Sequence, residues 1–345
     1  MGAYLRANLL LLVLTVLLCS VAYPLVLWGI GQTVFHEKAQ GSLVTDSSGK
    51  AIGSMLIAQP FIADEYFQPR PSAASYNGAA SGASNWSASN YLLRDRVARQ
   101  LGPIVKYHSG PNKGQLVGPD IEAWFQKDQF DGKPGIVAQW ASMHSASGIP
   151  QNWVKADKIN TEYVDQWRKS HTDEVAQWIK VHTETSEPKP EDLAEPFFAS
   201  YSKLHPGTFP GPVEHKTADG KTEKVIGPIK DGPDIQATFF DMWLQTHADA
   251  DLEQVPADAV MASGSGLDPD ITLANALWQL DRVAAAWAKK TNSSEEKLHK
   301  DIEQLLHEKS HAPLGGLAGV PLINVLEINL ALRDRYQKTA SVHMP

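Results

Sequence analysis

The stretch LLLLVLTVLLCSVAYPLVLWGI, residues 9–30, decides how the chain is organised, because it contains no charged residue. As a helix, its 22 residues would extend about 33 Å, which exceeds the roughly 30 Å hydrocarbon core of a bilayer. Tyr4, Tyr23 and Trp28 lie near its ends, where aromatic rings favour the membrane interface. Residues 1–35 are therefore predicted to form a transmembrane anchor, with residues 9–30 in contact with lipid.

A cleaved signal peptide is the alternative for this segment, since Ser20-Val-Ala22 resembles a cleavage site. The apolar run continues beyond Ala22, and Arg6 is the one charged side chain before the run. Both features favour a retained anchor. No second run is long enough to span a bilayer, so a single-pass protein is expected. Positive-inside reasoning places the N-terminus in the cytoplasm and the soluble part outside it. Pro24 predicts a kink that frees the carbonyl of Ser20.

The composition of the 345-residue chain limits the classes of function. Its net charge of −8 argues against a broad basic surface, so no nucleic-acid partner is expected. The one cysteine, Cys19, lies in the apolar run, which rules out an internal disulfide and a cysteine-based zinc or iron–sulfur site. The abundance of aromatic residues excludes a fully disordered chain.

The soluble part is predicted to be α+β, with a small sheet and several helices. Residues 41–57 have the pattern of a hairpin, with turn-forming residues between two apolar runs. Val260-Met-Ala262 is a candidate strand, and Asp268 and Pro269 are expected to begin a helix. Ser89 or Asn90 is expected to cap the first soluble helix. The predicted helices cover 89–101, 269–290, 293–309 and 322–334.

Residues 103–250 differ in composition from the sequence on either side, because they hold six of the ten Trp and many Gly-Pro pairs. Helical spacing of apolar residues predicts a helix over 158–182. A near-repeat also occurs: GPDIEAWF at 118–125 and GPDIQATF at 232–239. Two similar helix starts explain it more simply than a duplicated site. We expect a mostly helical, Trp-rich insert whose role the sequence does not reveal.

A zinc site is one candidate for chemistry, since His307-Glu-Lys-Ser-His311 matches H-E-x-x-H. On a helix, His307 and His311 would share a face and Glu308 would be the general base. Pro313 and two glycines follow at once, which weakens the helix. A membrane-anchored zinc hydrolase is therefore the alternative function, and no resident metal is expected otherwise.

The turn Ser263-Gly-Ser-Gly266 is a second candidate, because its backbone N–H groups could bind an anion at the start of a helix. The chain has no G-x-x-x-x-G-K-[ST] motif, so an independent P-loop nucleotide site is excluded. It also has no G-x-S-x-G hydrolase elbow. A simple turn before a helix is the plainer interpretation.

A series of motifs in a fixed order resembles the KdpC family, the C subunits of bacterial Kdp potassium-transporting ATPases. These motifs are Ala22-Tyr-Pro24, Gly41-Ser-Leu43, Gly53-Ser-Met-Leu-Ile-Ala-Gln59, Phe61, Tyr66-Phe-Gln-Pro-Arg-Pro-Ser72, Ser81-Gly-Ala-Ser-Asn85, Val255-Pro-Ala-Asp258, Ala262-Ser-Gly-Ser-Gly-Leu-Asp-Pro269, Ala276–Ala284 and Asn324-Val-Leu-Glu-Ile-Asn-Leu330. The resemblance covers 1–102 and 251–335. It predicts a KdpC-like soluble domain from 36–102 and 251–345, interrupted by the insert at 103–250.

The resemblance implies a non-catalytic subunit of a potassium-uptake ATPase in the bacterial inner membrane, with KdpA, KdpB and KdpF as partners. It implies help with assembly, with potassium entry, or with ATP binding by KdpB as a catalytic chaperone. ATP would be met only through a transient complex with KdpB, and no cofactor would be stably bound. The family-motif residues expected to be structural or to contact a subunit or nucleotide are Gln59, Phe61, Arg70, Pro71, Ser72, Ser81, Gly82, Ser84, Asn85, Ser263, Gly264, Ser265, Gly266, Leu267, Asp268, Pro269, Asn324 and Asn329.

Overall fold

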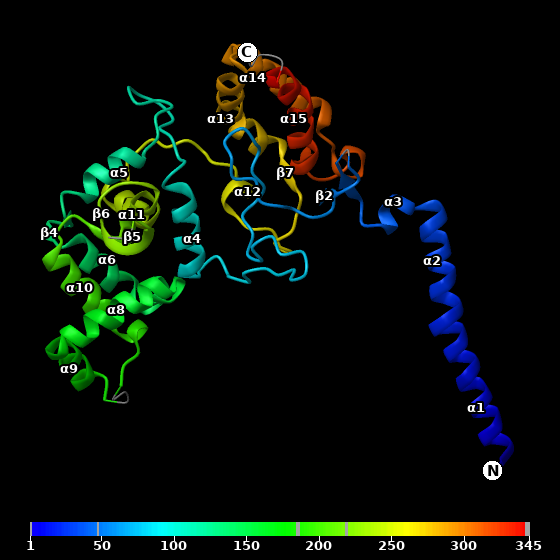
Figure 1. The fold of residues 1–345 in the computed structure, drawn as a ribbon, viewed down its shortest axis with the longest axis horizontal. Coiled ribbons are helices and arrows are strands. Elements are labelled where there is room, and N and C mark those ends of the chain that lie inside the picture. The colour runs from blue at the N-terminus through cyan, green and yellow to red at the C-terminus, as the bar shows by residue number, and fades with distance from the viewer. Residues whose placement is uncertain (1, 47, 184–186, 218–219, 342–345) are drawn as a thin grey trace. The chain divides into compact units, whose positions relative to one another are not determined.

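The computed structural model describes residues 2–46, 48–183, 187–217 and 220–341. Its contacts divide the chain into two units (Figure 1). We call Met1–Ser84 with Pro256–Pro345 the core unit, and Asn85–Val255 the inserted unit. Helices and four two-stranded sheets make up the described chain, which confirms the predicted α+β class. The division falls at 84/85 and 255/256 instead of the expected 102/103 and 250/251, because the helix over 91–101 packs on a helix of the inserted unit.

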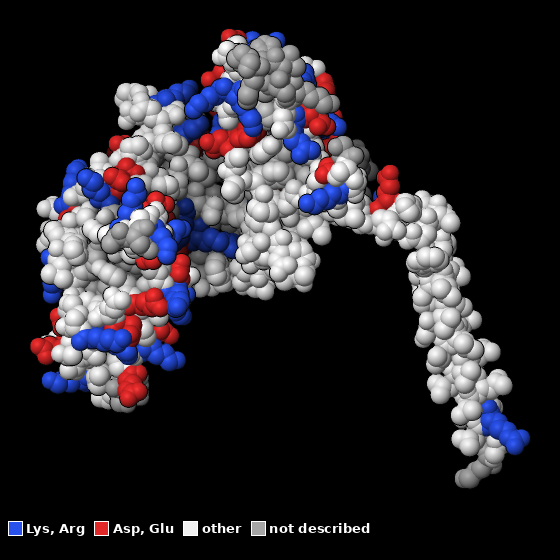
Figure 2. Space-filling view, in the orientation of Figure 1, with Lys and Arg blue, Asp and Glu red and all other residues white. Residues whose placement is uncertain are grey.

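The N-terminal apolar run is helical throughout, as α1 (Gly2–Val16), η1 (Leu17–Ala22) and α2 (Tyr23–Val34). This stretch is long and apolar enough to cross a membrane, and Figure 2 shows no charged side chain along it between its two ends. The six residues before Tyr23 form a π-helix, in which the Tyr23 N–H donates to Leu18 O. Such a wider turn absorbs the backbone mismatch that Pro24 creates by lacking an N–H.

The core unit begins with α3 (His36–Ala39) and the predicted hairpin, β1 (Leu43–Thr45) paired antiparallel with β2 (Ala51–Ser54). Its second half is built around α13 (Leu273–Thr291), α14 (Glu295–Lys309) and α15 (Val325–Ser341). The short elements between them are α12 (Ala257–Val260), β7 (Asp270–Thr272), η4 (Pro313–Gly316) and β8 (Leu322–Asn324). Trp287 and Phe67 are fully buried in the apolar core that these helices share.

Three helix starts in the core unit differ from the predictions. The helix expected at 269 begins at Leu273, with the Thr272 hydroxyl accepting from Asn275 N at 3.0 Å, because residues 270–272 pair as β7 with β8. For the same reason the last helix begins at 325 instead of 322. The helix expected at 293 begins at Glu295 without a side-chain cap. Val260, expected in a strand, ends the short helix α12.

The inserted unit is mostly helical, as predicted. The Asn90 side chain caps its first helix, α4 (Tyr91–Leu101), by accepting from Leu92 N at 2.8 Å. Its other elements are α5 (Gly118–Phe125), β3 (Gln129–Phe130), β4 (Lys133–Pro134), α6 (Ile136–His144), η2 (Ser145–Ser147), α7 (Ile149–Ala156), α8 (Lys158–Ser170), α9 (Thr172–Val181), η3 (Pro190–Leu193), α10 (Ala194–Leu204), β5 (Phe209–Lys216), β6 (Thr222–Ile229) and α11 (Pro233–Thr246).

The helix predicted over 158–182 is two helices, α8 and α9, which meet at His171. The His171 ring stacks on Trp167, and its Nδ1 bonds to Trp167 O at 3.0 Å. The Trp167 carbonyl also accepts from the His171 backbone N–H at 3.0 Å, so the ring shares the carbonyl that closes the last turn of α8. Apolar spacing continues across the break, so periodicity alone could not reveal it.

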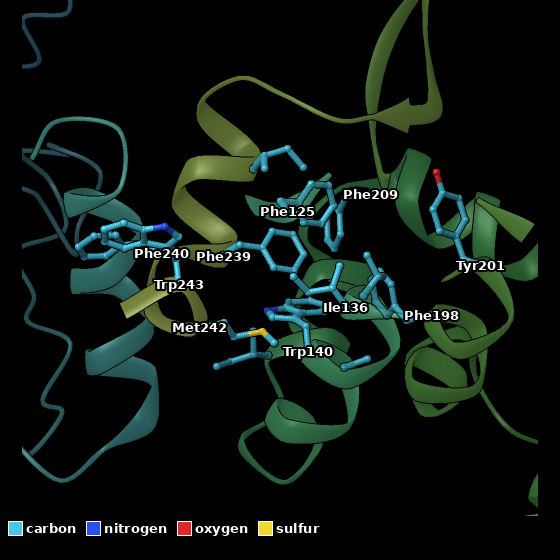
Figure 3. Close-up of a cluster of buried hydrophobic side chains, with 14 of the residues drawn as sticks. Phe125, Ile136, Trp140, Phe198, Tyr201, Phe209, Phe239, Phe240, Met242 and Trp243 are labelled. Carbon is cyan, nitrogen blue, oxygen red and sulfur yellow. The ribbon is translucent and has the colours of Figure 1, made fainter. Parts of the chain in front are cut away.

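Aromatic residues form the core of the inserted unit. Trp140 is fully buried and meets Phe198 and Phe209 edge to face, at 5.0 and 5.3 Å between ring centroids (Figure 3). The two halves of the near-repeat pack on each other here: Phe125 contacts Phe239 at 4.3 Å. Such burial and ring geometry give aromatic clusters their large stabilisation.

Candidate functional site

The turn Ser263–Pro269 lies between α12 and β7 and is held by its own side chains. The Ser263 hydroxyl is buried and accepts from Asp268 N at 3.4 Å. The Ser265 hydroxyl accepts from Leu267 N at 3.1 Å, and Ser263 O accepts from Gly266 N at 3.3 Å. Three N–H groups of the turn are therefore already paired within it.

The turn leads into strand β7 and not directly into a helix, so its N–H groups do not lie at a helix start as expected. Asp268, expected to cap the helix, instead accepts from Asp270 N at 3.1 Å through Oδ1. Burial chiefly raises the pKa of the nearby Asp270 carboxyl above its ordinary value. A second and a third carboxylate, those of Asp268 and Glu327, also raise it. Such acidic surroundings disfavour a polyanion.

Residues 70–82 brace the turn from a distant part of the sequence. The Arg70 guanidinium contacts Asp268 at 3.3 Å and donates to Ala262 O at 3.4 Å. The Ser72 hydroxyl donates to Gly266 O at 2.5 Å. Ser265 O accepts from the next part of this segment, at 3.2 Å from the Ser81 hydroxyl and 2.9 Å from Gly82 N. The structure thus brings together two motifs that lie almost 200 residues apart.

Backbone conformation tightens this brace. Gly266 has a φ of +68°, and a Cβ there would lie 2.8 Å from Gly82 O and 2.9 Å from the Ala74 Cβ. By contrast, a Cβ on Gly264 would meet nothing within 4 Å. Ser75 and Tyr76 follow each other at φ of 51° and 55°, a conformation that costs energy for residues with side chains. The Tyr76 hydroxyl donates to Arg70 O at 2.8 Å, and burial raises the pKa of this phenol.

The two family-motif asparagines hold other loops of the core unit. Asn329 is buried and brackets Phe67, accepting from its N–H and donating to its carbonyl, both at 2.8 Å. Asn324 donates to Met55 O at 3.0 Å and to the Asp270 carboxylate at 3.1 Å. Its Oδ1 accepts from Glu327 N at 3.1 Å, at the start of α15.

The remaining predicted site residues lie around this framework or away from it. Gln59 lies beside Gly53: a Cβ added to Gly53 would lie 2.7 Å from Gln59 Oε1. The Phe61 ring lies 5.6 Å from that of Tyr66. Leu267 is buried, and its carbonyl accepts from Ala58 N at 2.9 Å. The others are Pro71, which follows Arg70; Pro269, whose carbonyl accepts from Val325 N; and Ser84 and Asn85, which flank the boundary between the units.

Two residues of α13 belong to the framework, although the sequence analysis included them only within the motif Ala276–Ala284 and not among the candidate site residues. Gln279 binds the Gln68 backbone, accepting from its N–H at 2.8 Å and donating to its carbonyl at 3.1 Å. Arg282 donates to Asp64 O at 2.7 Å and Tyr66 O at 3.2 Å. The signal was a buried glutamine on the apolar face of a helix, since such a side chain needs partners.

The geometry required for the zinc hypothesis is absent from the described chain. Helix α14 ends at Lys309, so His307 and His311 do not share a helical face. His311 pairs with Leu322 through backbone bonds of 3.0 and 2.9 Å, and Glu308 accepts from Gln304. Within residues 2–46, 48–183, 187–217 and 220–341, no three His, Cys, Asp or Glu side chains are placed to hold a metal ion.

A family model described as KdpC, K+-transporting ATPase, c chain, matches residues 5–190 and 235–334, more than half of the chain. The chain belongs to the KdpC family. The match is interrupted at 191–234, so it also extends into residues that we expected to be foreign to this family. The turn and its brace are thus part of a KdpC chain.

Individual relatives agree with this assignment. Over 111 residues the chain is 47% identical to the potassium-transporting ATPase KdpC subunit of Pseudomonas syringae pv. tomato, covering 32% of this chain and 58% of the relative. Over 150 residues it is 34% identical to the KdpC subunit of Parvibaculum lavamentivorans, covering 44% and 79%. The chain thus spans less than two thirds of the length of the Pseudomonas relative.

Proposed function

We propose that the chain is a non-catalytic subunit of an ATP-driven potassium-uptake complex, joined by KdpA, KdpB and KdpF subunits. Membership of the KdpC family carries this proposal, and relatives bear the name of potassium-transporting ATPase subunits. The helix Gly2–Val34 supports a single-pass anchor in the bacterial inner membrane. Membership of a complex, and not a separate catalytic activity, is therefore the property to test.

The use of the family motifs inside the fold supports a role in assembly. The Arg70, Ser72 and Ser263 side chains form hydrogen bonds with backbone groups of the turn and of Ala262, and Arg70 also pairs with Asp268. A catalytic residue would instead present an activated group to a cleft. Gly264 and Ser265 are exposed at the tip of this braced turn. We infer that the brace holds these two residues in a fixed shape for contact with a partner subunit.

A role for the turn in ATP binding by KdpB is the second candidate, since the family resemblance implies such help. The paired N–H groups of Gly266, Leu267 and Asp268 weigh against it, because a phosphate would need them free. The net charge of −8 favours cation entry, since it raises the local concentration of cations within a Debye length. We therefore favour assembly or potassium entry on the extracytoplasmic side.

Topology distinguishes these two roles. The natural Cys19 lies in the apolar helix, so a Ser87→Cys variant supplies a new thiol in the soluble part, and Cys19→Ser serves as the background. Intact cells are treated with a membrane-impermeant maleimide, and lysed cells are the positive control. Labelling of intact cells is expected and excludes contact with cytoplasmic ATP. Labelling only after lysis would contradict the extracytoplasmic placement.

Growth tests the transport role itself. Cells deleted for this chain, and lacking other potassium-uptake systems, are expected to fail at micromolar potassium and to recover when the wild-type chain is restored. Recovery at millimolar potassium without the chain is the control for general health. Normal growth of the deletion strain at micromolar potassium would contradict the proposed function.

A further inference from the structure

The loop between α14 and β8 in the core unit presents apolar side chains to solvent. Leu314 and Leu317 are 77% and 90% exposed, and Val320 is 53% exposed. No residue from 312 to 326 carries a charge. Soluble proteins rarely leave a group of large aliphatic side chains in water unless that surface binds something. The loop is therefore a candidate interaction surface.

The loop is closed at its base and has a defined backbone shape. His311 and Leu322 pair through two backbone hydrogen bonds of 3.0 and 2.9 Å. Between them, Leu314 has a φ of 51°, a conformation that costs energy for a residue with a side chain. Gly319 has a φ of +80°, and a Cβ there would lie 3.3 Å from the Pro313 ring, so glycine lets the loop fold back on itself. The exposed leucines thus belong to a folded turn.

A short series of hydrogen bonds connects the base of the loop to the end of the apolar N-terminal helix. Helix α2 ends at Val34, and the carbonyl of nearby Glu37 accepts from Ser42 N at 2.8 Å. Ser42 O accepts from Met55 N at 3.1 Å, and Met55 O accepts from the Asn324 side chain at 3.0 Å. Asn324 ends β8, the strand that follows the loop. The loop therefore belongs to the end of the core unit at which the chain leaves this helix.

The chemistry of this end favours lipid over a protein partner. Leu43 and Leu56, the neighbours of Ser42 and Met55 in sequence, are also exposed, at 57% and 59%. Residues 312–320 contain no aromatic ring, no charge and no side chain that forms hydrogen bonds. Protein interfaces instead centre on Trp, Tyr and Arg and are rimmed by polar groups. A bilayer asks only for apolar side chains.

We propose that Leu314, Leu317 and Val320 insert into the surface of the bilayer that holds the N-terminal helix. The inference rests on the proposed membrane anchor and adds a second lipid contact to it. Apolar groups that bind at the interface reach about 5–10 Å below the headgroups. At that depth the backbone of the loop still meets water and headgroups, which an irregular segment requires. A single helix leaves the core unit free to rotate about the helix axis, and the loop would fix its orientation.

The test is quenching of a fluorescent dye by labelled lipid, with the full chain in phosphatidylcholine vesicles. In a Cys19→Ser background, Leu317→Cys carries an environment-sensitive dye at an exposed position where packing is not disturbed. Lys297→Cys is the matched control, because Lys297 is exposed on the first turn of α14, about 18 Å from its end at Lys309. Lipids with a doxyl group near the headgroup are expected to quench the dye at 317 and not at 297. Lipids with the doxyl group near the end of the acyl chain are expected to quench it less.

Adding Leu314→Asp to the Leu317→Cys chain is expected to reduce quenching about two-fold or more, because a carboxylate resists transfer into lipid. Vesicle flotation separates this inference from the anchor on which it rests. A chain that floats with vesicles but shows no quenching at 317 would overturn the loop contact alone, whereas a chain that does not float would overturn both. Equal quenching at 317 and 297 would contradict the inference. So would a dye at 317 that is shielded only when KdpA and KdpB are present, since a protein would then cover the loop.

Discussion

Replacing Gly266 by Ala tests whether the Ser263–Pro269 turn is a braced structural element. The added Cβ would lie 2.8 Å from Gly82 O and 3.0 Å from Ala74 N, both backbone atoms that cannot move alone. Residue 266 must also keep a φ of +68°, which costs a residue with a side chain about 1–2 kcal/mol. Forcing extra volume into a packed site adds about 1–3 kcal/mol. The core unit is therefore expected to lose about 2–5 kcal/mol of unfolding free energy.

Gly264→Ala is the matched control, since it changes the same motif by the same methyl group in open space. It is expected to alter the unfolding free energy by less than about 0.5 kcal/mol. The assay is thermal unfolding of the full chain in detergent, in which Gly266→Ala lowers Tm by about 5–15 °C. Equal loss in both variants, or a Gly266→Ala protein with wild-type Tm, would refute the brace.

Three further changes follow from the same contacts. Asn329→Leu leaves the buried Phe67 N–H and carbonyl unpaired, so the unfolding free energy measured in urea should fall by about 2–4 kcal/mol. An unchanged urea midpoint would contradict the structural role of the Asn329–Phe67 hydrogen bonds. Asp270→Asn removes a carboxyl group whose pKa is raised by burial. In the wild type, the protonated acid stabilises the fold below pH 3.8, and this stabilisation is lost as the pH rises through the folded-state pKa. The unfolding free energy of the variant should therefore rise relative to that of the wild type between pH 4 and 7, and a difference independent of pH would contradict this prediction. Trp140→Ala empties the aromatic core of the inserted unit and should cost about 3–5 kcal/mol, seen as faster hydrogen exchange in α6, α10 and α11; unchanged exchange would be inconsistent with that core.

Local signals in the sequence predicted much of the fold. In a bilayer, the backbone of the uncharged run 9–30 can form all of its hydrogen bonds only as a helix. The Asn90 cap depends on atoms two residues apart. The hairpin at 43–54 is likewise set by a short connection. These features were predictable because their partners lie close in sequence.

Long-range pairing explains what the sequence could not predict. Asp268 has the features of a helix cap, but Arg70, far away in sequence, holds its carboxylate, and the following residues pair with β8. The sequence does not show that Gln279 binds the Gln68 backbone, because that contact joins residues far apart in the chain. The family motifs identified Arg70, Ser72 and Gly266 as important residues, but only the structure shows that Ser72 binds Gly266 and that Arg70 binds Ala262 and Asp268.

Co-purification tests the central proposal, membership of the potassium-transporting complex, most directly. The full chain with a C-terminal affinity tag is expressed with its neighbouring transport subunits and isolated in mild detergent. We expect KdpA and KdpB to be recovered with the wild-type chain, and to be recovered in smaller amounts with Gly266→Ala. Recovery of the wild-type chain alone, stably folded and without these subunits, would contradict the account.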